Sequence, residues 1–266
     1  VLNSAKYNPT VINGGIINQF GTNTKLGNGE WMVIEADESD GTFVKLPSTI
    51  SVVTNIDYEH LDYYKSFSNL KSHFKKFLTQ VPFYGFAVVC IDDEITRKLV
   101  NSVTSTKLIK YGFHKSSDVR ASNIYYLKDK VRFDVFFEKK KKLIRDISLP
   151  LFGDYNIRNS LAAIAICTNL NVPDKIIKQS LSKYKGVERR LTKLWSSKKI
   201  TIIDDYAHHP TEIENVLRGL KKSYKKTKIA CIFQPHRFSR MVNLKTQFTK
   251  CFKSANHVFV SDVYRA

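Results

Sequence analysis

Residues 35–40 place four carboxylates within six positions, directly after the apolar residues 31–34. Carboxylates this close together repel one another unless a cation or a basic substrate neutralises them. Magnesium prefers hard oxygen ligands, so this cluster predicts a magnesium site. Because ligands bind at the carboxyl ends of strands in open α/β sheets, a position just after a predicted strand strengthens that reading.

A second cluster follows the run 51–54 and combines three carboxylates with one imidazole, in Asp57, Glu59, His60 and Asp62. A single histidine is more often an ordinary surface or core residue than a metal ligand. His60 therefore becomes a candidate ligand only through the acidic residues beside it.

Two further polar segments, 204–210 and 234–240, each lie between a predicted strand and a predicted helix. The adjacent His208 and His209 suggest zinc, but the segment lacks a four-ligand set and has no nearby cysteine. A helix N-terminus favours an anion instead. Arg237 and Arg240 are three positions apart, a spacing that can clamp one carboxylate or phosphate. The alternative is that these are ordinary helix caps and exposed arginines.

The hydrophobic pattern predicts a parallel sheet covered by helices, because short apolar runs alternate with helical periodicity. Strands are predicted at 31–36, 50–56 and 86–91, with a helix at 69–80. A β-meander is predicted at 119–127, 131–137 and 143–149, followed by helices at 155–170 and 173–183.

The pattern restarts after a break at 186–190 and predicts a second, smaller α/β unit. Its strands are predicted at 199–204, 228–233 and 257–261, and its helices at 210–220 and 241–252. This order is typical of a doubly wound, Rossmann-like sheet. We therefore expect an α/β chain with one domain at 1–187 and another at 188–266, both incomplete.

The formal net charge of +19 raises the question of nucleic acid or an anionic membrane as partner. The excess is spread over lysine pairs, and the run 139–142 is interpreted as a hairpin tip, so we expect no nucleic-acid surface. No apolar run is long enough to span a bilayer. The four cysteines are far apart and are expected to be reduced core thiols of a cytosolic protein.

Taken in order, seven blocks along essentially the whole chain resemble the Mur ligases, the ATP-dependent, carboxylate-activating ligases of peptidoglycan synthesis. The blocks are residues 11–15, 35–40, 53–56, 60–62, 156–159, 204–210 and 233–240. The last two favour the alanine-adding members. The resemblance implies an enzyme that uses ATP and Mg²⁺ to join L-alanine to the carboxylate of UDP-N-acetylmuramate through an acyl-phosphate.

The resemblance also implies roles for residues of the central ATP-binding domain and of the inter-domain break. Glu35 and His60 would bind the magnesium ion that bridges ATP and the acyl-phosphate. Asn156 and Asn159 would contact the nucleotide, and Arg190 its phosphates.

In the second domain the resemblance implies that Asp205 contacts the ribose of ATP. Four residues would orient the muramyl carboxylate and the incoming alanine: Tyr206, His208, Arg237 and Arg240. Among all these residues, His60, Arg190 and His208 are expected to be catalytic.

The sequence departs from the family pattern in two places. It contains no G-x-x-x-x-G-K-[ST] phosphate loop, which is expected upstream, so we expect residues 1–266 alone to be inactive. Glu188 stands where the family has a glycine before its arginine pair, so the choice of Arg190 over Arg189 stays open.

Two alternatives to the alanine-adding function remain. A related ligase that recycles murein tripeptide would share the metal residues and differ in amino-acid recognition. A non-catalytic nucleotide- or nucleic-acid-binding protein is the alternative from another class, and the positive charge favours it weakly.

Overall fold

Strand β5 (Phe86–Cys90) is buried on both faces and sets the layering of the first unit. Phe86, Val88 and Cys90 point into one core, and the alternate residues Ala87 and Val89 point into another, as the two-residue period of a strand requires. Helices from both sides close these cores: α2 (Phe67–Thr79), α3 (Glu94–Val100), α4 (Asp154–Asn169) and α5 (Asp174–Ser182). The sheet therefore lies between α4 and α5 on one face and α2 and α3 on the other.

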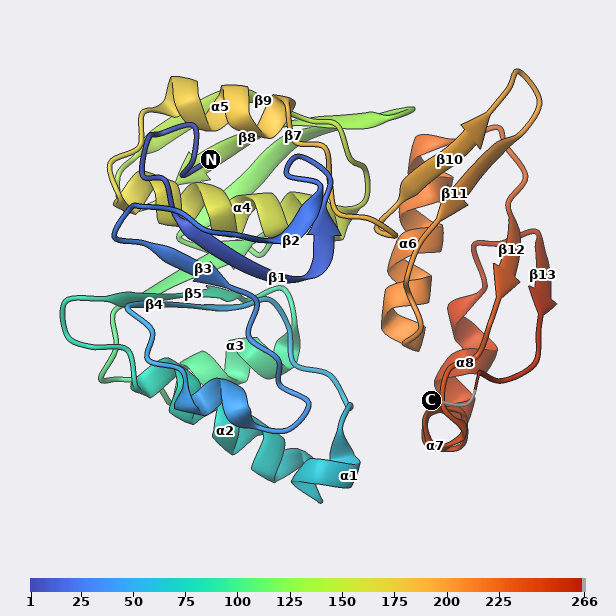
Figure 1. The fold of residues 1–266 in the computed structure, drawn as a ribbon, viewed down its shortest axis with the longest axis horizontal. Coiled ribbons are helices and arrows are strands. Elements are labelled where there is room, and N and C mark those ends of the chain that lie inside the picture. Colours follow the sequence, from blue (N-terminus) through green and yellow to red (C-terminus); the bar gives the residue numbers. More distant parts are fainter. Residues whose placement is uncertain (265–266) are drawn as a thin grey trace.

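The computed structural model describes residues 1–264 (Figure 1). Within them, six strands form the main sheet in the order β4-β5-β6-β7-β8-β9. Besides β5, these strands are β4 (Ile50–Val53), β6 (Leu108–Gly112), β7 (Val119–Leu127), β8 (Lys130–Phe137) and β9 (Lys142–Leu149). The pairs from β4 to β7 are parallel and the two pairs from β7 to β9 are antiparallel. The predicted parallel sheet and meander are confirmed, and β6 was missed.

A three-stranded sheet stands apart from the main sheet within the described residues. It consists of β1 (Thr10–Ile17), β2 (Thr22–Lys25) and β3 (Met32–Ile34). The strand predicted at 31–36 was expected to be buried, and this expectation is wrong. The observed strand in this region is β3, which is shorter and pairs with β1. Its residues Met32, Val33 and Ile34 are between 41% and 54% exposed. Apolar composition predicts a strand, but burial also requires a layer packed over it.

The second unit begins with an antiparallel pair, β10 (Thr192–Ser196) and β11 (Thr201–Asp204). It continues with α6 (Pro210–Ser223), β12 (Ala230–Phe233), α7 (Phe238–Asn243), α8 (Lys245–Cys251) and β13 (His257–Val260). Strands β12 and β13 are parallel, as a doubly wound unit requires. In the described part of the chain, however, β11 pairs with β10 and not with β12, so one continuous sheet is not formed.

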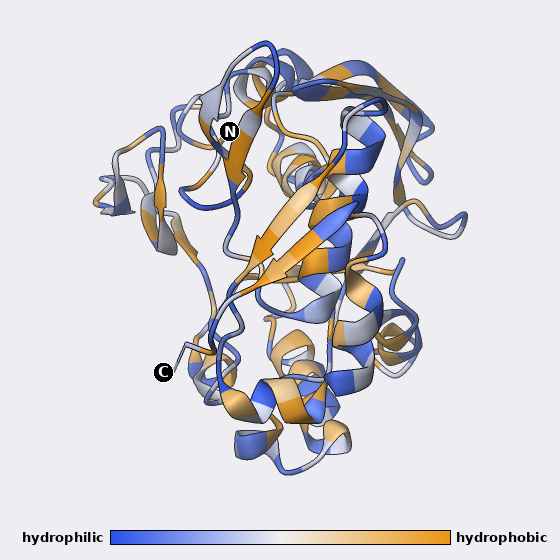
Figure 2. Ribbon diagram, turned by 90° about the vertical axis from the view of Figure 1, so that its right-hand side faces the viewer, coloured by the Kyte–Doolittle hydropathy of each residue, from blue (hydrophilic) through white to orange (hydrophobic). Residues whose placement is uncertain are grey.

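The outer face of β12 and β13 is apolar and uncovered. Ile232 is 83% exposed and Phe259 is 59% exposed. Figure 2, which faces the side of the second unit, shows these two parallel strands in hydrophobic colours with no helix in front of them. The opposite face packs on α6 and α8 through a core that contains Ile213, Phe233 and Phe248.

Helix α6 joins the two units. A small core of Phe152, Leu191 and Tyr224 spans the junction. Gly219 of α6 lies so close to the N-terminus of α4 that a Cβ there would be 3.0 Å from the Cα of Gly153. This close approach brings the start of α4 beside the second unit.

Candidate active site

The loop between β4 and α1 (Leu61–Tyr64) carries the second acidic cluster of the sequence. His60 is the N-cap of α1 and has φ 57° and ψ 27°, a left-handed conformation that few non-glycine residues adopt. Its Nε2 atom lies 3.5 Å from Oε1 of Glu38. The ligand atoms of Glu38, Glu59 and His60 all lie within 4.8 Å of one another.

These three side chains suit a divalent cation. Two carboxylates match the preference of Mg²⁺ and Mn²⁺ for oxygen ligands, and partial exposure of all three leaves room for the water molecules that Mg²⁺ retains. The hydrogen bond with Glu38 raises the pKa of His60 above its ordinary value, against the effect of burial, and the charge of Glu59 adds to the rise. The surroundings of His60 thus favour positive charge.

Glu35, which the sequence paired with His60, lies outside this group of three. Its Oε2 accepts a hydrogen bond from the backbone N–H of Gly14 at 2.7 Å, and the residue is exposed. Side-chain turns at Asp37 and Asp40 bend the following loop, and buried Tyr64 donates a hydrogen bond to the carbonyl of Glu38. Glu38 therefore faces His60, and the role of Glu35 as a metal ligand stays a prediction.

The polar segment 204–210 leads into helix α6, and its second histidine, His209, caps that helix. His209 is buried and caps α6, because its Nδ1 accepts from the N–H of Thr211 at 3.3 Å. Glu212 accepts from the N–H groups of His208 and His209 at 3.0 Å and 3.2 Å, which completes a capping box. The N–H of Thr211 in the first turn is already bonded to His209, and an anion at this helix end stays a prediction.

Residues 183–191, which we call the connector, link α5 to β10. Asp205, just after β11, bonds to the end of this connector. Its two carboxylate oxygens accept from the N–H groups of Leu191 and Ala207, each at 2.9 Å. Burial raises the pKa of Asp205, while these hydrogen bonds and the charge of Arg190 oppose the rise. Both carboxylate oxygens thus hold backbone N–H groups, and the ribose contact of Asp205 stays a prediction.

The neighbouring arginines of the connector face different partners. The Nε atom of Arg189 lies 3.2 Å from Oδ2 of Asp204, and its Cζ atom lies 5.0 Å from the ring centroid of Tyr206. Arg190 lies 3.7 Å from Oε1 of Glu212 and is half exposed. The structure thus places Arg190, and not Arg189, beside Glu212.

The two asparagines predicted to contact ATP lie in the first turns of α4. Asn156 donates to the carbonyl of Phe152 at 2.8 Å, and Asn159 is exposed. Between them in sequence, Arg158 pairs with Asp92 at 2.8 Å and has a structural role. Burial, and then the charge of Asp205, raise the pKa of Tyr155. Tyr155 packs against the core that contains Leu191, so the start of α4 lies next to the segment that links the two units.

Aromatic rings line the strand ends of the second unit. The ring centroids of Tyr206 and His208 are 5.1 Å apart, those of His208 and His236 are 5.7 Å apart, and His236 stacks on Tyr264 at 5.5 Å. The predicted substrate residues Tyr206 and His208 are therefore continuous with the segment after β12.

Arg237 and Arg240 do not behave as one clamp in this structure. Arg240 crosses to the first unit and donates to Oε1 of Glu59 from Nη2 at 2.6 Å and from Nε at 3.0 Å. Arg237 is exposed and has φ 66° and ψ 126°, outside the regions that side chains favour. Two predicted site residues, His60 and Arg237, are thus held in uncommon backbone conformations.

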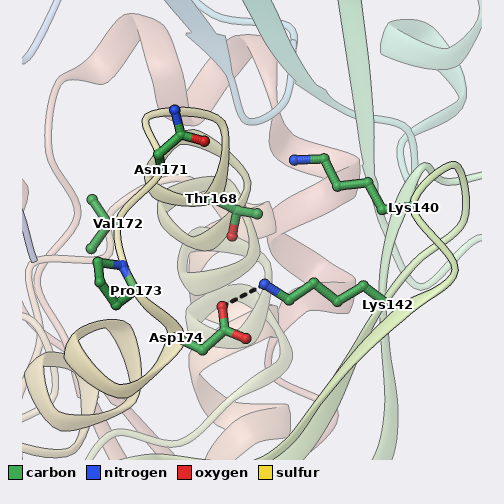
Figure 3. A pocket seen from close by; sticks show the side chains of 7 residues that line it. All are labelled: Lys140, Lys142, Thr168, Asn171, Val172, Pro173 and Asp174. Atoms are coloured by element: carbon green, nitrogen blue, oxygen red, sulfur yellow. Dashed lines mark hydrogen bonds and ion pairs between the residues drawn. The ribbon is translucent and has the colours of Figure 1, made fainter.

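A surface hollow of about 390 Å³ lies away from these clusters, between the β8–β9 turn and the end of α4. Figure 3 shows Lys140 and Lys142 reaching toward Asn171 and Asp174, with Lys142 paired to Asp174 at 2.6 Å. Lysines beside the C-terminus of a helix complement its dipole. The antiparallel pairing of β8 with β9 confirms the predicted hairpin tip.

Two family domains match the chain. The Mur ligase middle domain matches residues 13–167, and the Mur ligase, glutamate ligase domain matches residues 189–264. The chain belongs to the Mur ligase family. Together the two matched regions contain every site residue discussed above.

Curated relatives extend this assignment along the whole chain. The chain is 46% identical over 270 aligned residues to a UDP-N-acetylmuramate–L-alanine ligase of Paramagnetospirillum magneticum, of which it covers 56%. It is likewise 46% identical to a ligase of the same name from Bartonella bacilliformis, of which it covers 57%. The chain therefore spans a little over half the length of these Mur ligases.

Solved structures of Mur ligases have the same fold as this chain. The UDP-N-acetylmuramate–alanine ligase of Thermotoga maritima superimposes with a TM-score of 0.81 at 29% identity, covering 99% of this chain and 57% of that one. A murein peptide ligase of Psychrobacter arcticus shares the fold, with a TM-score of 0.68 at 23% identity, over 97% of this chain and 58% of that one. In the part of the chain that the structure describes, no helix is long and apolar enough to cross a membrane.

Proposed function

We propose that the protein is an ATP-dependent ligase that joins L-alanine to the carboxylate of UDP-N-acetylmuramate through an acyl-phosphate. The names of the relatives at 46% identity support this choice of substrates. The structural observation that carries the proposal is the group of Glu38, Glu59 and His60, which faces Arg240 across the junction of the two units.

The chemistry of the reaction suits this arrangement. A carboxylate is a poor electrophile, so the γ-phosphoryl group of ATP is first transferred to it. The amine of alanine then attacks the acyl carbon and phosphate leaves. Catalysis of this kind depends on positioning and on neutralising negative charge that develops on the phosphoryl oxygens.

Glu38, Glu59 and His60 would hold Mg²⁺. When bound, the ion supplies positive charge to the phosphoryl oxygens of ATP and of the acyl-phosphate. Glu35, whose Oε2 accepts from the N–H of Gly14, stays a candidate ligand for the same ion.

The remaining predicted residues bind and orient the reactants. Asn156, Asn159 and Asp205 contact the nucleotide, and Arg190 contacts its phosphates. Tyr206 and His208 lie beside His236 at the strand ends, where they would orient the muramyl carboxylate and the incoming alanine with Arg237 and Arg240. Because ATP is a co-substrate, we place the reaction in the cytoplasm.

The test measures the transfer of labelled L-alanine to UDP-N-acetylmuramate by the protein encoded in the complete reading frame that contains these residues. Product formation that requires ATP and Mg²⁺ is expected. Faster transfer of the tripeptide L-alanyl-γ-D-glutamyl-meso-diaminopimelate would instead identify a tripeptide-recycling ligase. Nucleotide binding with neither product would identify a non-catalytic binding protein.

A further inference from the structure

The carboxylate of Glu59 has two competing partners. It belongs to the group with Glu38 and His60, whose ligand atoms lie within 4.8 Å of one another. It also accepts two hydrogen bonds from the guanidinium of Arg240, at 2.6 Å and 3.0 Å, on the same oxygen Oε1.

The pair with Arg240 joins the two units. Glu59 lies on the β4–α1 loop and Arg240 on α7, and Figure 1 shows α1 and α7 near each other at the lower end of both units. The side chains are 25% and 10% exposed, so water screens the pair only in part. A second contact lies nearby, where Thr211 Oγ1 donates to Asp57 Oδ2 at 2.6 Å.

A divalent cation on Glu59 would oppose this pair in two ways. It would withdraw electron density from the carboxylate that accepts from Arg240. It would also place a second positive charge within a few ångströms of the guanidinium, and like charges at that distance repel. The side chain of Arg240 has a further anchor at the carbonyl of His236, 3.2 Å away, and can stay on its own unit when Glu59 is withdrawn.

We propose that Glu59 is a shared ligand that makes cation binding and the cross-unit pair with Arg240 antagonistic. Without the cation, Glu59 holds Arg240 and keeps it from any substrate. With the cation bound, Arg240 is released beside Arg237 and is available to a carboxylate or phosphate. The identity of that anion rests on the proposed function, whereas the antagonism does not.

Thermodynamic linkage makes the effect reciprocal, so removing Arg240 must strengthen cation binding. Binding of Mn²⁺ to the intact protein is measured by electron paramagnetic resonance. We expect Arg240→Met to tighten Mn²⁺ binding by about tenfold, within the usual range of coupling between sites. Arg237→Met removes the same charge from a neighbouring exposed position and controls for the general electrostatic effect, for which we expect at most about twofold.

A double-mutant cycle with Glu59→Gln isolates the pair. In that background Mn²⁺ should bind more weakly, and Arg240→Met should no longer tighten it. Equal effects of Arg240→Met and Arg237→Met would overturn the proposal, as would the absence of Mn²⁺ binding in the millimolar range.

A second measurement needs no substitution. The ¹⁵Nε–¹H signal of Arg240, protected by its bond to Glu59, should shift and exchange faster with water as Mg²⁺ is added. A signal unchanged at saturating Mg²⁺ would contradict the antagonism. Both measurements are independent of turnover, so a failed ligase assay with these results intact would reject the proposed function and keep the shared ligand.

Discussion

His60 illustrates how a residue gains its chemistry from neighbours that are distant in sequence. Glu38 lies 22 positions away yet approaches His60 Nε2 to 3.5 Å, which raises the pKa of the imidazole. The adjacent carboxylate of Glu59 adds to the rise. The histidine was identifiable as a candidate from its acidic surroundings, but its partner was not.

We expect Glu38→Gln to lower the pKa of His60, because the charged acceptor of its hydrogen bond is lost. Nuclear magnetic resonance titration of the His60 ring in the metal-free protein measures this shift. Glu35→Gln, which removes a carboxylate outside the group, is the matched control and should leave the titration nearly unchanged. Equal shifts in both variants would refute the specific role of Glu38.

The raised pKa of His60 makes the free energy of unfolding depend on pH. The folded state binds this proton more tightly than the unfolded state does. The contribution to stability is therefore fully present below pH 6.5, the ordinary pKa, and is lost as pH rises through the folded pKa.

Arg237 gives a second prediction at the scale of one residue. At φ 66° and ψ 126° any side chain is strained, whereas glycine is not. We expect Arg237→Gly to be more stable than Arg237→Ala by about 1 kcal/mol, after allowing for the greater entropy of unfolded glycine. Urea denaturation of both variants checks the order, and a more stable alanine variant would contradict the backbone conformation.

At the scale of elements, the divided helix after β12 shows how local context overrides periodicity. The apolar spacing predicted one helix at 241–252, but the structure has α7 and α8, which meet at Leu244. Leu244 has φ −115° and is buried in the core with Phe248. Burying this side chain requires a bend that the hydrophobic pattern does not encode.

Helix α6 carries a prediction about packing between elements. Replacing Gly219 with alanine improves helix propensity by about 1 kcal/mol. The new Cβ would lie 3.0 Å from the Cα of Gly153, and such overpacking costs about 1–3 kcal/mol. We therefore expect net destabilisation in thermal unfolding, whereas Lys221→Ala on the exposed face should change stability by less than about 0.5 kcal/mol. A stabilised Gly219→Ala variant would show that α6 and α4 are further apart.

At the scale of the whole molecule, the two units are joined by polar contacts around a small apolar core. Lys222 of α6 pairs with Asp154 of α4 at 2.7 Å, and Tyr224 donates to Asp129 of the β7–β8 turn at 2.8 Å. Lys193 of β10 also reaches Asp129 at 2.8 Å. Two of the chain's many lysines, Lys193 and Lys222, thus form ion pairs at this junction.

Asp154 makes the stability of the junction depend on pH. Burial opposes its ionisation, but hydrogen bonds from Lys222 and Tyr126 outweigh burial and hold its pKa below 3.8. This contribution is fully present above pH 3.8 and is lost as pH falls through the folded pKa. We expect Asp154→Asn to cost about 1–3 kcal/mol near pH 7 and to flatten the acid limb of the stability curve. Chemical denaturation across pH tests this, and an unchanged acid limb would contradict it.

Local patterns in the chain were sufficient for the fold class, for most helices and strands, and for the polar clusters at the strand ends. These properties depend on hydrophobic period and on turn chemistry over a few neighbouring residues. Tertiary contacts were needed to group His60 with Glu38 and Glu59 and to send Arg240 across to the first unit. They also left β3 exposed, paired with β1 and not with the main sheet. Such outcomes depend on which distant segments meet, and local periodicity carries no information about that.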